Sequence, residues 1–237
     1  MQCPKYGRLQ KEMGRAYTDI DFAGYKSQST KVAKFLLGLG YKEDLEVNTF
    51  FGGERLIFNH PTNGLHVDVF FDRLNFCHEV NWVGRLEAEN WTLPLAEMLM
   101  EKMQIVRLNE KDLIDTIMLL LEHPLGDSDQ ETIHIDRVSK LCARDWGLWR
   151  TLTMNLEKVG RLGQEYTSLS GDEKEKLAAQ AALEKAHTEI LHLTAANSHI
   201  AQERDEARKW ARFYQALAQS WKKAYENTWK NNRVIPK

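Results

Sequence analysis

Two aspartates stand two positions apart in the stretch RAYTDIDFAGY, residues 15–25. Asp19 and Asp21 flank Ile20, and Phe22 follows, so the stretch otherwise resembles an apolar strand, where charged residues are unusual. Side chains at positions i and i+2 of a strand point to the same face. Two carboxylates on one face repel each other unless a cation lies between them or one of them is protonated. The spacing therefore predicts a cation site.

A third acid occurs in a second strand-like stretch, HVDVFF, residues 66–71, where Asp68 stands between two valines. Carboxylate oxygens suit Mg²⁺, which readily keeps substrate phosphates among its ligands. Three acids can hold two metal ions about 3.5–4 Å apart for in-line attack on a phosphate. We expect Asp19, Asp21 and Asp68 to converge at one end of a sheet as ligands of two Mg²⁺ ions. The competing interpretation places these acids on a solvated sheet face.

The strands and helices expected around these acids indicate an α/β (α+β) fold with a small mixed sheet. Strands are expected at residues 18–25, 47–53, 55–60 and 65–72, and a helix at residues 29–41. The last two strands should form a hairpin, because Pro61-Thr62-Asn63-Gly64 separates them. One face of the helix should carry its apolar residues Val32, Phe35, Leu36 and Leu39.

From about residue 93 onward, the apolar residues recur with the spacing of an α-helix. Helices are expected at 93–108 and 110–123, followed by one or two within 134–162. Pro94 suits the first turn of the first of these helices. The second should bury a stripe made of Leu113, Ile117, Leu120 and Leu121. We therefore divide the chain into an α/β core at 1–90, a helical region packed on it at 91–165, and a helical extension at 166–237.

The extension begins at Ser170 and Glu173, which have the spacing of a capping box. Apolar or small residues then recur with heptad spacing, interrupted by Asn197 and Arg204, at Leu183, Ala186, Ile190, Leu193, Ile200, Ala207, Tyr214 and Trp221. This pattern predicts a long helix or a helical hairpin that needs a partner surface. The returning helix at residues 172–200, the core domain or a second copy of the chain in a homo-oligomer would supply one.

The end of the extension combines aromatic and basic residues. On one helix, an apolar stripe is formed by Trp210, Phe213, Tyr214, Leu217, Trp221, Tyr225 and Trp229. Basic residues of the opposite face are Arg208, Lys209, Arg212, Lys222, Lys223 and Lys230. These can meet RNA phosphates, or they can merely keep the helix soluble.

Composition excludes several classes of protein. The 237 residues are 43% hydrophobic and 28% charged, which suits a soluble globular protein, and the net charge of −2 gives no general attraction to nucleic acid or membranes. Cys3, Cys77 and Cys142 are far apart, which favours the cytoplasm over an oxidising compartment and argues against a thiolate zinc site. No apolar run approaches the ~20 residues of a membrane span, and no signal peptide, hydrolase elbow or P-loop pattern occurs.

Four stretches together, GRAYTDIDFA, HVDVFF, LPLAEMLMEKMQIVR and NEKDLIDTIMLL, resemble the nucleotidyltransferase superfamily with the DNA polymerase β-type core. The resemblance is greatest to the bacterial branch of AbiE-type abortive-infection toxins and minimal nucleotidyltransferases, and it covers roughly residues 7–123. The residues that correspond to the motifs of this branch are Arg15, Asp19, Asp21, Asp68, Lys102, Arg107, Lys111, Asp112 and Asp115.

The resemblance implies Mg²⁺-dependent transfer of a nucleoside monophosphate from an NTP, such as ATP, to a hydroxyl of RNA, a protein or a small molecule. A toxin–antitoxin or defence role would accompany it. Asp19 and Asp21 would hold metals that bridge the triphosphate. Asp68 would hold the second metal and help to deprotonate the acceptor. Lys102 and Lys111 would face phosphates, although exposed helix positions commonly carry lysine.

Further residues of the nucleotide site follow from the same resemblance. Arg15 precedes the acid pair, Arg55 corresponds to a strand arginine near the nucleotide, and Gly7-Arg8 stands where the family has a Gly-Gly or Gly-Ser turn. That turn normally follows a helix and a strand, for which the 18 residues before Asp19 leave no room. This departure favours an alternative, a non-catalytic module of the same fold that binds nucleotide or a partner protein. A structural protein that oligomerises through its extension is the third hypothesis.

Overall fold

A computed structural model describes residues 3–231, apart from the side chains of residues 214, 217, 218 and 221–231. Its mixture of helices with a small mixed sheet confirms the expected α/β class. The chain divides into two compact units, Met1–His192 and Leu193–Lys237. The first unit contains the sheet and all three aspartates.

The main sheet has the strand order β1-β4-β3-β2. Its strands are β1 (Asp19–Gly24), β2 (Lys42–Glu43), β3 (Arg55–Asn59) and β4 (His66–Phe71). β1 and β4 are parallel, whereas β4 with β3 and β3 with β2 are antiparallel. The expected β3–β4 hairpin is confirmed, and Gly64 in its turn adopts φ 67°, a conformation that glycine tolerates without steric cost.

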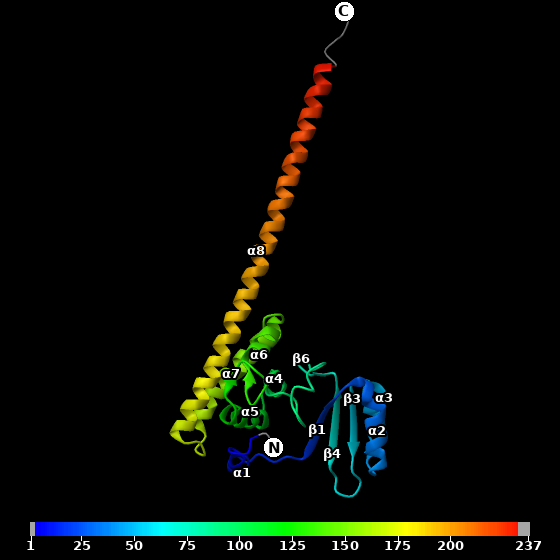
Figure 1. Cartoon of the computed structure of the whole chain (residues 1–237), viewed down its shortest axis with the longest axis vertical. Helices are drawn as coiled ribbons and strands as arrows, with labels where there is room; N and C mark the ends of the chain where they lie inside the picture. The colour runs from blue at the N-terminus through cyan, green and yellow to red at the C-terminus, as the bar shows by residue number, and fades with distance from the viewer. Residues whose placement is uncertain (1–2, 232–237) are drawn as a thin grey trace, which may run out of the picture. The chain divides into compact units, whose positions relative to one another are not determined.

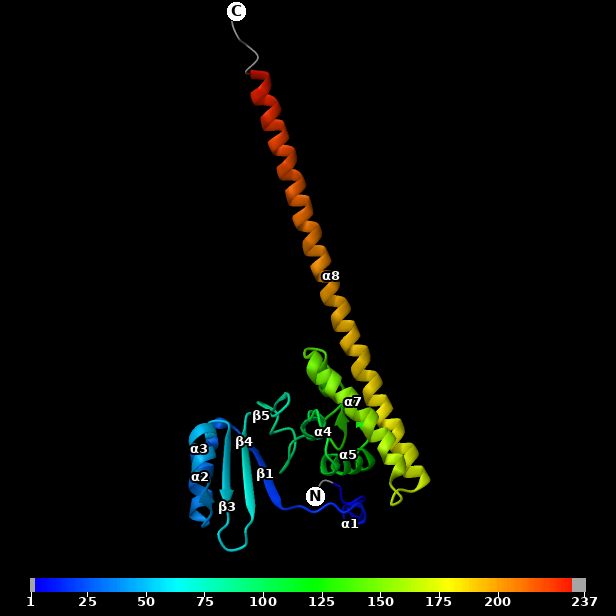
Figure 2. The same ribbon diagram turned by 180° about the vertical axis from the view of Figure 1, so that it is seen from behind.

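The two faces of the sheet differ because side chains alternate along each strand. One face buries a small core made of Leu36, Leu56, Phe58, Val67, Val69 and Phe71. Leu36 comes from α2 (Ser29–Gly38), and both α2 and α3 (Leu45–Phe51) lie on the same side of β3 and β4 (Figures 1 and 2). Arg55 and Asp68 belong to the alternate positions, so they point to the face that these helices leave uncovered.

Two expectations in this part were wrong. Residues 47–53 were expected to form a strand, but residues 47–51 belong to α3 and residues 52–53 form a turn. Asp44 caps this helix by accepting a hydrogen bond from Val47 N at 3.0 Å. Within α2, Leu36 is buried and Val32 packs against the core, whereas Phe35 is 66% exposed and Leu39 is also exposed. The apolar face of α2 is therefore narrower than its sequence indicates.

A second core lies in the helical region. Its helices are α4 (Leu95–Met103), α5 (Glu110–Glu122), α6 (Ile135–Cys142) and α7 (Trp146–Leu162), joined by α1 (Arg8–Glu12). The shorter elements of the first unit are two strand pairs and two 3₁₀ turns. The strand pairs are β5 (Arg73–Asn75) with β6 (Glu79–Asn81) and β7 (Leu125–Gly126) with β8 (Ile133–His134), and the turns are η1 (Lys26–Gln28), which precedes α2, and η2 (Gly163–Glu165), which follows α7. The expected buried stripe of α5 is confirmed at Leu113, Ile117, Leu120 and Leu121.

The extension is one helix, α8 (Gly171–Asn231), rather than a hairpin. The expected capping box is confirmed: Glu173 N donates to Ser170 Oγ at 3.3 Å, and Ser170 N donates to Glu173 Oε2 at 2.8 Å. The first turns of α8 lie beside α7 (Figure 1), where one face buries Leu177, Ala181, Glu184 and Thr188. No described helix has both the length and the apolar character needed to cross a membrane.

Candidate active site

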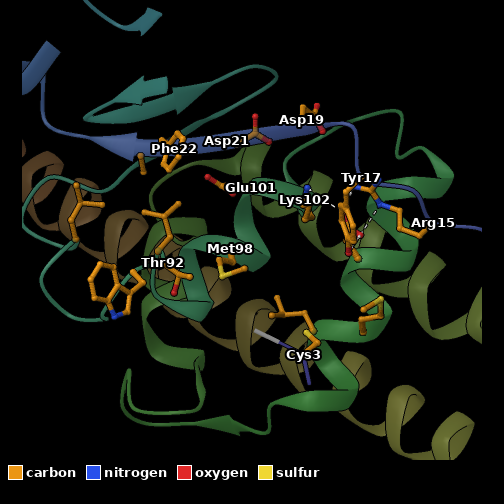
Figure 3. Close-up of a pocket in the computed structure, with 17 residues that line it drawn as sticks. Cys3, Arg15, Tyr17, Asp19, Asp21, Phe22, Thr92, Met98, Glu101 and Lys102 are labelled. Carbon is orange, nitrogen blue, oxygen red and sulfur yellow. Dashed lines mark hydrogen bonds and ion pairs between the residues drawn. The ribbon is translucent and has the colours of Figure 1, made fainter. Parts of the chain in front are cut away.

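The edge strand β1 carries Asp19 and Asp21 on the face of the sheet that α2 and α3 leave open. In the parallel pairing of β1 with β4, Asp21 lies opposite Asp68 and Asp19 lies opposite His66. Figure 3 shows Asp19 and Asp21 along β1, with Glu101 and Lys102 of α4 across from them. The register thus brings Asp21 and Asp68 together from positions far apart in sequence.

A cleft of about 540 Å³ lies between β1 and the helical region. Polar and aromatic residues that line it are Arg15, Tyr17, Asp19, Asp21, Phe22, Trp91, Thr92, Glu101, Lys102 and Asp115. A second hollow of about 280 Å³ shares Asp19, Asp21, Glu101 and Lys102 with the cleft and extends to Arg55 and Asp68. All three predicted acids therefore line connected space, and the cleft has the size of a small-molecule site.

No described cation contacts Asp19 or Asp21 directly, although the charges of Lys102 and His66 act on Asp21, and that of Arg15 on Asp19, from a longer distance. Neither carboxylate forms an ion pair with any described residue. Burial raises the pKa of Asp21, and the nearby charges of Asp19 and Asp68 raise it further. An anion pair in need of a cation fits Mg²⁺, whose preferred ligands are carboxylate oxygens. In the described part of the chain, however, no three acidic, histidine or cysteine side chains are arranged to hold a metal ion.

Asp68 differs from the other two acids because an arginine neutralises it. Arg55 donates from Nε to Oδ1 at 2.7 Å and from Nη2 to Oδ2 at 2.6 Å, a bidentate pair. His66 Nε2 lies 3.6 Å from Oδ2 of the same carboxylate. Arg55 therefore lies at the hollow, as the sequence suggested, but it is held by the acid expected to bind metal.

Two positively charged side chains at the cleft, Arg15 and Lys102, both pair with Asp115. Arg15 binds it in bidentate fashion at 2.9 and 3.0 Å, and Lys102 Nζ lies 3.4 Å from its Oδ2. Burial alone would lower the pKa of Lys102, but the charges of Asp115 and Asp112 outweigh it and raise that pKa. Asp115 of α5 thus positions Arg15 and Lys102 at the cleft.

Three predicted residues lie elsewhere. Gly7 precedes the short helix α1, and Arg8 pairs with Glu12 and Glu173. Lys111 is exposed at the start of α5. None of the three is among the residues that line the cleft or the adjoining hollow. Their proposed contacts with a nucleotide stay predictions without a place in this site.

The structure adds residues that the sequence reading missed. Glu101 of α4 faces the acid pair, and burial followed by the charge of Asp21 raises its pKa to about 7. The available signal was a carboxylate beside Lys102 on an otherwise apolar helix. Trp91 lines the cleft from the loop before α4, is fully exposed and has a φ of 72°, which is rare for a bulky residue. No local pattern distinguishes such a loop tryptophan.

No family model, curated protein or solved structure matches this chain. The resemblance to nucleotidyltransferases therefore rests on the motif residues alone and stays a prediction.

Proposed function

We propose that this protein is a Mg²⁺-dependent nucleotidyltransferase that acts in the cytoplasm. The observation that carries the proposal is the pairing of β1 with β4, which lines a nucleotide-sized cleft with Asp19 and Asp21 and puts Asp68 beside them. Arg15 and Lys102 lie at the same cleft and offer positive charge to phosphates. Anionic ligands for a metal and cationic ligands for a triphosphate are the two requirements of this chemistry.

Each residue has a role in the proposed reaction. Mg²⁺, when held by Asp19 and Asp21, would supply the charge that offsets the triphosphate. Arg15 and Lys102 orient phosphate oxygens. The acceptor hydroxyl oxygen attacks the α-phosphorus, its proton passes to Asp68, and the bond from the α-phosphorus to the bridging oxygen breaks to release pyrophosphate. For this step, Asp68 must leave the ion pair with Arg55, whose guanidinium then becomes available to the substrate.

The direct test supplies the full chain with Mg²⁺ and each of the four NTPs, labelled at the α-phosphate, together with RNA, protein or small alcohols as acceptors. We expect label to enter one acceptor class and pyrophosphate to be released in equal amount. A folded chain that binds no NTP by calorimetry in the presence of Mg²⁺ would contradict the proposal.

The Arg55–Asp68 pair favours a second candidate function, a non-catalytic module of this fold that binds nucleotide. An arginine that permanently neutralises the third acid would leave no proton acceptor for the hydroxyl. This candidate predicts NTP binding without pyrophosphate release by the wild-type chain, whereas Arg55→Ala, which frees Asp68, should allow release. The enzyme instead predicts that the wild-type chain itself releases pyrophosphate, and that Arg55→Ala leaves transfer measurable because Asp68 stays in place.

Trp91 should act as a stacking platform for the base of a bound nucleotide. An exposed indole at the cleft has no protein packing to explain its conformation, and base–aromatic stacking contributes about 1–3 kcal/mol. We expect Trp91→Ala to weaken NTP binding about tenfold in calorimetry. The matched control is Trp146→Ala, an exposed tryptophan of α7 that does not line the cleft. Equal affinities for the two variants would contradict this role.

A further inference from the structure

The middle part of α8 exposes large apolar side chains in a regular row. Leu193 is 59% exposed and Ile200 is 60% exposed, and Leu183 and Ile190 are exposed on the same helix. Soluble monomers seldom leave such a row in water. Residues 193–231 form a unit of their own, so their helix depends on its amphipathic face finding a surface.

The row follows a heptad repeat from residue 190 onward. Its a positions are Ile190, Asn197, Arg204 and Ala211, and its d positions are Leu193, Ile200, Ala207 and Tyr214. This 3.5-residue period is the pattern of a coiled coil rather than of a helix that packs on a globular core. The opposite face of the early helix, with Leu177, Ala181 and Glu184, is already buried in the first unit.

We propose that a second copy of this chain covers the row, and that the two α8 helices form a parallel, in-register coiled coil from Ile190 onward. Parallel alignment places Asn197 of one chain opposite Asn197 of the other, where the two amides can hydrogen-bond. Antiparallel alignment pairs a with d positions and would leave that amide against an apolar side chain. One buried Asn of this kind specifies a dimer and its register.

Charge complementarity supports the same arrangement. In a parallel dimer, a g residue pairs with the e residue five positions later on the other chain, and here these are Glu203 and Arg208. In the single chain, Glu203 lies 3.6 Å from His199 and Arg208 lies 3.2 Å from Asp205, both at exposed positions. Exposed pairs of this kind contribute little, so they can be exchanged for the pairing across the dimer. Arg204 can likewise reach Glu203 of the second chain.

Sedimentation equilibrium of the full chain tests the proposal. We expect a species of twice the 27.5 kDa chain mass at micromolar concentration. Ile200→Asp places a carboxylate from each chain face to face in the core of the coiled coil and should weaken dimerisation more than about 100-fold. Gln202→Asp adds the same charge at the outward f position and should leave the dimer unchanged. A monomeric wild-type chain, or equal effects of the two variants, would overturn the proposal.

Orientation is tested by disulfide formation in a Cys77→Ser background, which removes the one exposed cysteine of the described residues. Asn197→Cys should form an interchain disulfide within the intact dimer, because in-register a positions bring the two β-carbons close. Gln202→Cys, on the outer face, should not. A dimer that fails to cross-link through position 197 would overturn the parallel arrangement.

Discussion

Asp21→Asn should lower nucleotidyl transfer by more than about 100-fold without destabilising the protein. The substitution keeps the shape of the side chain but removes the charge that would bind the metal, and even indirect disturbance of metal ligands costs 10–100-fold. Stability should be unchanged or higher. The raised pKa of Asp21 means that its ionised form is disfavoured in the folded protein by burial and by two neighbouring carboxylates, and asparagine carries no such charge.

Opposite responses of activity and stability are what distinguish a metal ligand from a structural acid. Transfer of label and thermal unfolding are measured on the same preparation. Asp127→Asn is the matched control, since Asp127 is exposed and does not line the cleft; both quantities should stay at the wild-type value. A variant Asp21→Asn that keeps its activity, or that loses activity together with its fold, would contradict the assignment.

The acids of the site were predictable because each interrupts an apolar pattern. Aspartate is depleted in strands, yet these strands carry Asp19, Asp21 and Asp68. A functional role for the charge is one reason why a sequence departs from local propensity in this way. Asp19 and Asp21 share a face once β1 is recognised as a strand, but the placement of Asp68 beside Asp21 depends on the parallel β1–β4 register, which no local pattern specifies. Whether they bind metal stays a prediction.

The neighbours of these acids were not predictable from local pattern. Residues 47–53 have strand-like composition, yet Asn48 of α3 accepts from Ile57 N at 2.8 Å and donates to Ile57 O at 3.3 Å. This contact with β3, together with the Asp44 cap, stabilises the helix even though the local propensity favours a strand. The pairing of Arg55 with Asp68 likewise depends on hairpin register, which places one side chain diagonally from the other. Tertiary context decided both.

Glu184 should make the stability of the first unit fall as pH rises. Its side chain is 0% exposed on the buried face of α8, Thr188 Oγ1 donates to Oε1 at 3.3 Å, and Oε2 has no hydrogen-bond partner among the described residues. Nearby groups are Cys142, which is buried, and Ser139, which contacts Thr188 and His187 at 3.2 and 2.8 Å. His187 in turn lies 3.3 Å from Asp136. None of these neighbours places a cation on the Glu184 carboxylate.

Burial raises the pKa of Glu184 from 4.5 to about 8. The folded protein therefore keeps the proton over a range where the unfolded chain releases it. By linkage, stability declines between about pH 4.5 and 8 and is insensitive to this group below that range. The loss between pH 5 and 8 is on the order of 3 kcal/mol. A protonated carboxyl group carries a hydrogen-bond donor, which an ionised carboxylate lacks.

Glu184→Gln should remove this pH dependence, because glutamine is neutral at every pH and keeps an acceptor for Thr188. Urea unfolding followed by tryptophan fluorescence at pH 5, 6, 7 and 8 measures the effect. The variant should match the wild type closely at pH 5 and exceed it by on the order of 3 kcal/mol at pH 8. Glu175→Gln, at an exposed position of the same helix, should follow the wild-type curve. A difference between Glu184→Gln and wild type that stays constant from pH 5 to 8 would show that Glu184 is not protonated in the folded protein.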